Sequence, residues 1–297
     1  MAPKKDTNGN VQAAEPARAI APVHAAMPTL PDESTLPDRA GEGISYDQAD
    51  RLMPLVYVLQ TGSPQVNPSG PAYVEGARAG DILLRNSIPP TVTGSTGIFF
   101  QPCYLNKVWI EWVPRTRGGG GGQGFVARHM ERPAEAVQRQ DPNDPNKQIW
   151  SMPNGNVVQE TRQHFGLVHL RGEFANAPDG QKIHMASGFS AYVIPMTSTG
   201  HTISRQWNTM QAELRTPSGK RLNAYDQIWR LTLRQRSNAK GTWYTWAVTY
   251  MGRANTEEAL AGKALFDECA RGDREAEQPV HDEAADVVEQ RQENAPF

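Results

Sequence analysis

The sequence predicts a mainly β protein, a β-barrel or sandwich with helical additions, flanked by disordered ends. Between residues 46 and 271, short apolar runs rich in β-branched and aromatic residues alternate with clusters of Gly, Pro, Asn and Ser, which is typical of strands joined by turns. Only two segments of this region have helical spacing. Residues 1–45 and 272–297 hold few large apolar residues, so they cannot bury enough surface to offset the entropy of ordering.

The first half of the folded region is predicted to begin with a short helical turn over 46–52, capped by Ser45. Apolar runs then predict strands at 55–59, 82–84, 98–105 and 107–113. Five consecutive glycines (118–122) and the Pro/Asn/Asp-rich run QDPNDPNKQ follow. Because such sequences favour extended, flexible chain, we expect a flexible insertion with little structure over about 114–160.

The second half combines strands with two helices. Strands are predicted at 161–170, 189–195, 228–236 and 242–251, the last two forming a hairpin with a turn at 237–241. An apolar stripe of Ile203, Trp207, Met210 and Leu214 predicts a helix over 198–214. A final helix is expected over 256–271, with an N-cap at Asn255 or Thr256 and Gly272 just past its end.

Charge is unevenly distributed along the chain. The formal net charge of −2 combines a body, residues 46–271, of 24 Lys/Arg against 18 Asp/Glu with a tail, residues 272–297, of 2 against 8. The body is therefore at +6 and the tail at −6. This asymmetry favours a polyanion-binding body and a tail that competes for the same surface.

The sequence offers few signs of catalysis, metal binding or membrane insertion. It holds no phosphate-binding loop and no nucleophile elbow, and its seven histidines are dispersed; His164 and His169 are expected to face opposite sides of one strand. We therefore expect no enzymatic activity, cofactor or metal. Cys103 and Cys269 fit a reducing cytoplasm, and no apolar run is long enough to span a membrane. A cytoplasmic location is expected.

The segment 201–253 carries the strongest functional pattern, nine Lys/Arg interleaved with seven Trp and Tyr against only two acids. In the predicted hairpin, Trp229, Leu231 and Leu233 alternate with Arg230, Arg234 and Arg236, so one face enters the core while the other presents arginines. Lys240 and Trp243 stand beside this row. Cations attract phosphates and aromatic rings stack on exposed bases, so we expect single-stranded nucleic acid to bind here.

A second, supporting patch is predicted around the strand at 107–113 and the glycine run. Its residues are Lys107, Trp109, Trp112, Arg115, Arg117 and Arg128. Trp109 and Trp112 have opposite parity, so at most one of them is exposed in a regular strand. Two structural interpretations stay open: the arginine row as a solvated or guarded sheet edge, and the glycine run as a simple linker.

The tail carries eight acids and ends in Asn294-Ala295-Pro296-Phe297. Phe297 offers a ring for an apolar pocket and a free carboxylate for a basic neighbour, with Glu293 and Pro296 beside it. This ending resembles the acidic tail tip of bacterial and some phage single-stranded DNA-binding proteins. The resemblance implies an OB-like barrel body, and a tip that recruits replication and recombination proteins while competing with DNA. The large body and long loops look more like a phage-encoded protein, which would act in the cytoplasm of a bacterial host.

These observations together predict a non-catalytic protein that binds and protects single-stranded DNA during replication or recombination, with Glu293, Pro296 and Phe297 recruiting partners. A homo-oligomer is compatible with this interpretation. Two alternatives remain at this point: a structural or assembly protein of a virus particle, which the β-rich body also suits, and an accessory nuclease of replication or recombination.

Overall fold

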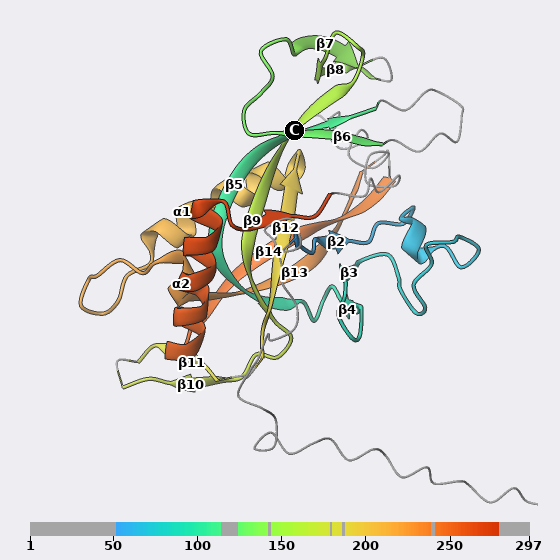
Figure 1. Ribbon diagram of the computed structural model, residues 1–297. Coiled ribbons are helices and arrows are strands. Elements are labelled where there is room, and N and C mark those ends of the chain that lie inside the picture. Colours follow the sequence, from blue (N-terminus) through green and yellow to red (C-terminus); the bar gives the residue numbers. More distant parts are fainter. Residues whose placement is uncertain are drawn as a thin grey trace, which may run out of the picture. The chain divides into compact units, whose positions relative to one another are not determined.

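The computed structural model describes residues 52–113, 124–141, 144–178, 180–185, 188–238 and 241–278 (Figure 1). All of them belong to one compact unit within residues 46–297. The described chain is mainly β with two long helices, which confirms the predicted fold class. The helical turn expected over 46–52 and the outer parts of both termini fall on residues outside these ranges.

A ten-stranded sheet forms the body, built on the long antiparallel pair β5 and β9 (Figure 1). Its strands are β5 Ile98–Trp112, β6 Phe125–His129, β7 Val137–Asp141, β8 Asp144–Ser151, β9 Val157–His169, β10 Phe174–Asn176, β11 Lys182–His184, β12 Ser190–Thr197, β13 Gln227–Asn238 and β14 Gly241–Arg253. The strands predicted at 98–105 and 107–113 are thus one continuous strand, β5, with a bulge between Pro102 and Tyr104.

The sheet is open. Its strand order is β10-β11-β14-β13-β5-β9-β8-β7, with β12 pairing β9 and β6 pairing β5 as branches. Among the residues that the structure describes, the end strands β10 and β7 do not pair, so the predicted OB-like barrel does not close. Two small sheets accompany it: β2 Val56–Val58, β3 Asp81–Leu84 and β4 Thr91–Thr93 in one, β1 Leu52–Met53 and β15 Glu275–Ala276 in the other.

Alternation along the strands divides the core between two faces of the large sheet. On β12, Tyr192, Ile194 and Met196 join one buried cluster, while Val193 between them joins another. Helix α1 (Thr199–Glu213) covers the first face and buries Trp207 there, as its predicted apolar stripe requires. Helix α2 (Thr256–Arg271) covers the second face with Leu265. The described residues also form two short 3-10 helices, η2 Pro64–Val66 and η3 Ala224–Asp226.

The predicted boundaries of α2 are confirmed at both ends. Asn255 is the N-cap: its side chain accepts from the backbone N–H of Glu258, and Glu258 returns the bond to the backbone of Asn255. Gly272 follows the helix in the left-handed conformation, at φ 82°, where a glycine is favoured because it has no Cβ.

The flexible insertion expected over 114–160 is wrong for the part of it that the structure describes. Strands β6, β7 and β8 lie there, and β8 joins β9 through the pairs Trp150–Val158 and Ser151–Val157. These strands enclose a small cluster in which Trp109 meets Met152 and Val158. Most of the Pro/Asn/Asp-rich run 140–148 lies within these strands, since its first two residues end β7 and Asp144 begins β8.

The folded body also extends past residue 271, where the tail was expected to begin. β15 pairs in parallel with β1, and Ala276 is buried beside Met53. The guanidinium of Arg128 donates to the backbone oxygens of Ala276 (2.7 Å) and Glu277 (3.1 Å). The segment 273–278 is therefore part of the fold.

Candidate nucleic-acid interface

The hairpin of β13 and β14 extends beyond the rest of its sheet. β13 pairs with β5 only from Trp229–Phe100 to Leu231–Ile98, whereas its pairing with β14 continues to Asn238–Gly241. We call the portion from Thr232 to Ala247 the arm. β5 pairs with no residue of the arm, so the arm extends past the end of β5.

The register of the arm separates two faces, as the alternation predicted. Thr245 lies opposite Arg234 and Trp243 lies opposite Arg236, so these four side chains share a face. Leu233 and Trp246, also a cross-strand pair, point to the other face and join the core. Arg234 and Arg236 are exposed, and Trp243 is half-buried.

Contacts with Gln60, Gly80 and Gly94 hold the arm in place. The side-chain amide of Gln60 forms two hydrogen bonds with the backbone of Tyr244, donating to its oxygen (3.0 Å) and accepting from its nitrogen (2.9 Å). The backbone nitrogen of Leu233 donates to the oxygen of Gly94 at 2.8 Å. The ring of Tyr244 lies so close to Gly80 that a Cβ there would come within 2.6 Å of it. The outward residues are therefore presented on a fixed support.

The arginines of the predicted row differ in their freedom to bind a ligand. Arg230 is engaged within the chain, since its guanidinium donates to the backbone oxygens of Thr96 (2.8 and 3.0 Å) and Ser95 (3.3 Å). These bonds use Nε and one terminal nitrogen of the guanidinium, and the contact of Arg230 with nucleic acid stays a prediction. Arg234 and Arg236 form no ion pair or hydrogen bond with any residue within the described ranges. Both side chains are exposed and are placed to meet phosphates.

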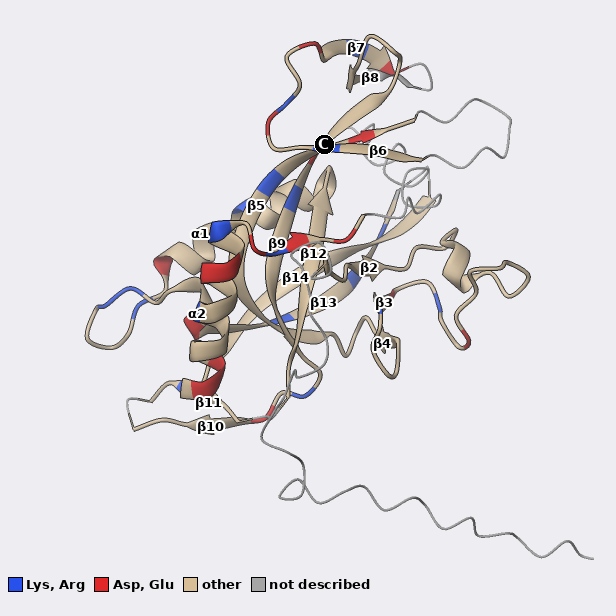
Figure 2. Cartoon of the chain, in the orientation of Figure 1, with Lys and Arg blue, Asp and Glu red and all other residues tan. Residues whose placement is uncertain are grey.

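The second predicted patch is only partly assembled. Lys107 is exposed and lies directly opposite Arg162 of β9, so β5 and β9 each carry one basic residue at the same level (Figure 2). Trp109 is not available, because it is 9% exposed and packs edge-on against Trp150. Arg132 covers the Trp150 ring at 3.8 Å. This corrects the expectation that Trp109 stacks on a base.

The other residues predicted to contact nucleic acid are Trp112 and Arg128, which the structure describes, and several that lie outside the described ranges. Trp112 is half-buried and meets Phe125 edge-on. Arg128 has a side chain only 15% exposed, and it binds β15 rather than solvent, so its predicted contact with nucleic acid is corrected as well. Several predicted residues lie outside the described ranges: Arg115, Arg117 and Lys240, and the tail residues Glu293, Pro296 and Phe297.

The pairing of β13 with β5 also shows that the two patches are separate along the sheet. Since the strands are antiparallel, the arm continues past the first residue of β5, Ile98, while Lys107 lies towards the opposite end of that strand. Basic residues are spread over several elements rather than joined in one stripe (Figure 2). The arm is therefore the candidate site, and Lys107 with Arg162 forms a distinct, smaller basic pair.

Sequence reasoning missed Arg162 and Gln60. Arg162 lies in the predicted strand at 161–170, and its position opposite Lys107 depends on a strand pairing that no local pattern specifies. Gln60 follows a predicted strand and resembles any polar turn residue. Only its bonds to Tyr244, distant in sequence, reveal its role.

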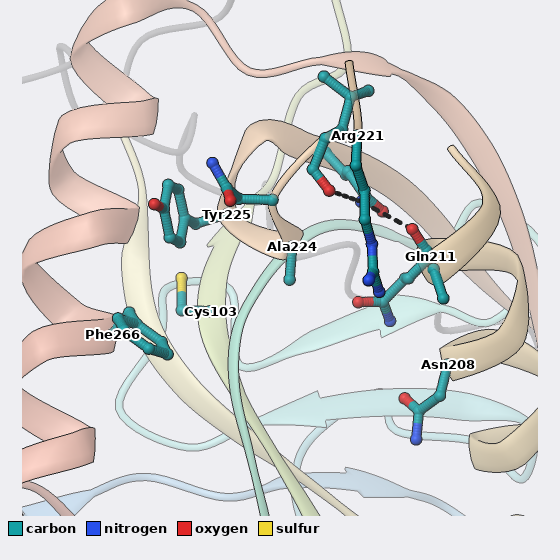
Figure 3. Close-up of a pocket in the computed structure, with 11 residues that line it drawn as sticks. Cys103, Asn208, Gln211, Arg221, Ala224, Tyr225 and Phe266 are labelled. Atoms are coloured by element: carbon teal, nitrogen blue, oxygen red, sulfur yellow. Dashed lines mark hydrogen bonds between the residues drawn. The ribbon is translucent and has the colours of Figure 1, made fainter. Parts of the chain in front are cut away.

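An open pocket of about 530 Å³, with both polar and apolar lining, lies among α1, η3 and α2 (Figure 3). It is lined by Cys103, Asn208, Gln211, Ala212, Arg221, Leu222, Asn223, Ala224, Tyr225, Gln227 and Phe266. Part of its polarity is used internally, since the Gln227 amide donates to the backbone oxygens of Gln211 and Leu222. Burial raises the pKa of Cys103 far above its usual range, so this thiol stays protonated and is a poor nucleophile.

The fold and the arm define a mainly β protein with two helices and an exposed arginine–tryptophan hairpin. The model of the Pam3 phage gp34-like protein family matches residues 24–275, and the chain belongs to this family. A phage family agrees with the origin expected from the sequence. No curated protein and no solved structure matches the chain. Within the described ranges, no helix has the length and apolar character needed to cross a membrane.

Proposed function

We propose that this phage-family protein binds single-stranded DNA on the outward face of the arm, without acting chemically on it. The observation that carries the proposal is the cross-strand pair of Arg236 and Trp243, with Arg234 on the same face. A guanidinium attracts a phosphate, and the neighbouring indole offers a plane to the adjacent base.

The preference for single strands follows from the tryptophan. Base–aromatic stacking requires a base whose flat face is free, and in a duplex both faces are occupied by neighbouring base pairs. The support of the arm adds to affinity, because side chains on a fixed backbone lose less entropy on binding. Sequence readout is not expected, since guanidinium–phosphate contacts and stacking tolerate every base.

The acidic C-terminal residues are part of the same proposal. Residues 279–297 hold five acidic side chains and one arginine and end in Pro296-Phe297. They begin just after the segment that Arg128 fastens to the body. We propose that they compete with DNA for basic surface and recruit replication or recombination proteins through Phe297, as the resemblance to single-stranded DNA-binding proteins implies.

Fluorescence anisotropy tests the proposal. A labelled single-stranded oligonucleotide and the matching duplex are titrated with the full chain at two salt concentrations. We expect tighter binding to the single strand, weakening steeply as salt rises. Equal affinity for both forms, or no binding at low micromolar protein, contradicts the proposal. Metal-dependent loss of the labelled strand would instead identify a nuclease.

A further inference from the structure

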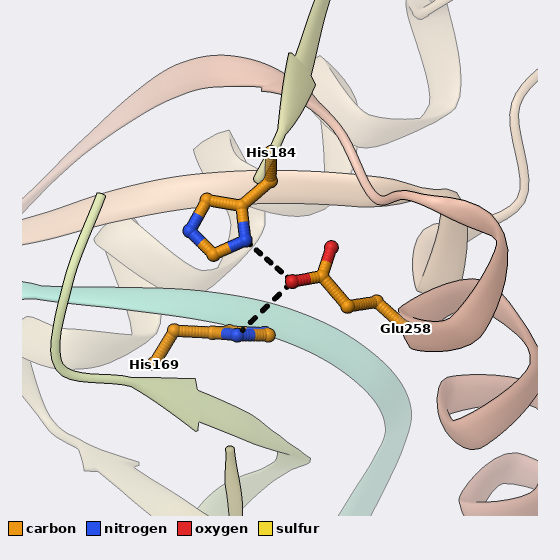
Figure 4. A group of neighbouring side chains, drawn as sticks. All are labelled: His169, His184 and Glu258. Carbon is orange, nitrogen blue, oxygen red and sulfur yellow. Dashed lines mark hydrogen bonds and ion pairs between the residues drawn. The ribbon is translucent and has the colours of Figure 1, made fainter. Parts of the chain in front are cut away.

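Three ionisable side chains from three different elements meet in the interior, on the face of the sheet that α2 covers (Figure 4). His169 ends β9, His184 ends β11 and Glu258 lies in the first turn of α2. They are 0%, 0% and 2% exposed. One ring nitrogen of each histidine and one carboxylate oxygen all lie within 4.8 Å of one another. The arm contributes no residue to this cluster, so the role of the cluster is independent of DNA binding.

The hydrogen bonds around the cluster determine which nitrogen of each ring carries its proton. His184 Nε2 lies 2.9 Å from the backbone oxygen of Arg171, which can only accept, so Nε2 donates. Gln101 determines which nitrogen of the His169 ring is protonated. Its amide nitrogen donates to the backbone oxygens of Tyr225 and Glu258. Its amide oxygen therefore faces His169 Nε2. His169 Nε2 therefore donates to Gln101, at 3.3 Å.

Both Nδ1 atoms consequently point at the same atom, Oε1 of Glu258, from 2.5 Å for His184 and 3.4 Å for His169. A single proton between His184 Nδ1 and Glu258 Oε1 completes the hydrogen bond between these two side chains. It leaves His169 Nδ1 fully buried and without a hydrogen-bond partner among the described residues. Because the ring carries its proton on Nε2, which donates to Gln101, Nδ1 of the neutral imidazole directs its lone pair at the carboxylate. A buried lone pair facing a carboxylate oxygen is unfavourable unless a positive centre lies between them.

We infer that His169 Nδ1, His184 Nδ1 and Glu258 Oε1 bind a divalent transition metal, with Zn²⁺ the best match. Two imidazoles and one carboxylate are a known zinc donor set, in which a water completes the fourth position. Each ligand is oriented by an outer partner, as zinc ligands usually are: Arg171 O, the Gln101 amide and, for Glu258 Oε2, the backbone nitrogen of Asn255.

The three ligand atoms lie within 4.8 Å of one another, and the two separations from Glu258 can be compared with those of a tetrahedral site. Metal bonds of about 2.0–2.1 Å in a tetrahedral arrangement separate ligand atoms by roughly 3.3 Å. The distance of 3.4 Å between His169 Nδ1 and Glu258 Oε1 already matches this separation. The distance between His184 Nδ1 and Glu258 Oε1 must increase by about 1 Å. The metal takes the place of the proton shared by that pair, so binding releases a proton.

The inferred role is structural. The ligands connect the end of β9, the short strand β11 and the start of α2. The Asn255 amide, which donates to the oxygen of His184, joins the last two as well. Because all three ligands are sealed from solvent, the metal is in no position to meet a substrate. Metal binding of this kind contributes directly to folding stability.

Metal analysis of the untagged full-length chain tests the inference, since a His tag would itself bind zinc. We expect about one zinc per chain by mass spectrometry of the purified protein. Removal of metal by a chelator should lower the melting temperature, and added Zn²⁺ should restore it. Titration of the metal-free chain with Co²⁺ should produce the visible absorption of a nitrogen–oxygen site.

Two variants and a control make the result specific. His169→Gln and Glu258→Gln should each weaken zinc binding by at least tenfold, whereas His164→Gln, a buried histidine on the other face of the sheet, should retain it. Absence of bound metal together with a melting temperature that Zn²⁺ does not change would overturn the inference and leave a protonated His184–Glu258 pair. Full zinc retention in His169→Gln would overturn it by placing the metal elsewhere.

Discussion

Arg236 and Trp243 lie directly opposite each other across the β13–β14 hairpin, on the face turned away from the core pair Leu233 and Trp246. The arrangement follows from the two-residue period of a strand, which turns alternate side chains to opposite faces. A cation and an aromatic ring thereby share one exposed surface at the end of the hairpin. The core pair beneath them, with the Gln60–Tyr244 bonds, fixes where that surface stands.

Neutralising the arm should reduce the salt dependence of DNA binding. In the double variant Arg234→Gln/Arg236→Gln, two phosphate contacts are lost, so the slope of log K against log salt should fall by about 1.4. Anisotropy titrations over a salt series measure this slope. The control Lys182→Gln/Lys220→Gln removes two exposed lysines away from the arm. Equal changes in both double variants would show that only overall charge matters.

Removing the indole should weaken binding at every salt concentration. We expect Trp243→Leu to reduce affinity by roughly 5- to 150-fold, the equivalent of about 1–3 kcal/mol of stacking. Trp243→Phe should recover much of this, because it retains an aromatic plane. Trp112→Leu serves as the comparison, and an equally large loss in that variant would place the stacking surface on β5 instead.

Two truncations should separate the tail from the fold. Deletion of 279–297 removes five acidic side chains and keeps β15, so it should leave the melting temperature unchanged and strengthen DNA binding at low salt. Deletion of 272–297 also removes β15, leaving Arg128 without its backbone acceptors and exposing Met53. It should destabilise the protein by about 2 kcal/mol or more in urea unfolding. The competition is disproved if the shorter deletion leaves DNA affinity unchanged.

Acid should destabilise the protein partly through His164. Burial, aided by the charge of Arg162, lowers the pKa of this histidine to about 3, and its ring stacks on Trp207 and bonds Ser204. The folded pKa is below the unfolded value of about 6.5, so as pH falls below 6.5 the unfolded state binds a proton that the folded state does not. This stability is present above about pH 6.5 and is lost progressively towards pH 3.

The loss from His164 should amount to about 2 kcal/mol between pH 7.5 and pH 5. Urea unfolding of the wild type and of His164→Gln at both pH values measures it. The variant should lose that much less than the wild type over the same interval. An identical pH dependence in both proteins rules out the effect.

Local patterns in the sequence were sufficient for the elements that form by local rules. The stripe through Trp207 predicted α1, the Asn255 cap and Gly272 predicted α2, and the alternation of Trp229 with its arginines predicted the two faces of the hairpin. Each of these depends on residues within one or two turns of a helix or along one strand.

What sequence could not predict depends on long-range pairing. Arg128 and Arg230 look like ligand-binding cations, yet both guanidiniums donate to backbone oxygens of distant segments. His169, His184 and Glu258 are far apart in sequence, and only the packing of α2 on the sheet brings them together. The strands within the presumed insertion were missed because the start of β8 is rich in proline, asparagine and aspartate, which are depleted in strands.

Photo-cross-linking tests the central claim, that the arm is the DNA interface, most directly. A single-stranded oligonucleotide carrying 5-bromodeoxyuridine is irradiated in complex with the full chain, and the cross-linked peptide is identified by mass spectrometry. We expect cross-links within residues 234–245, centred on Trp243. Cross-links confined to the Lys107–Arg162 region of β5 and β9, with none on the arm, would contradict the claim.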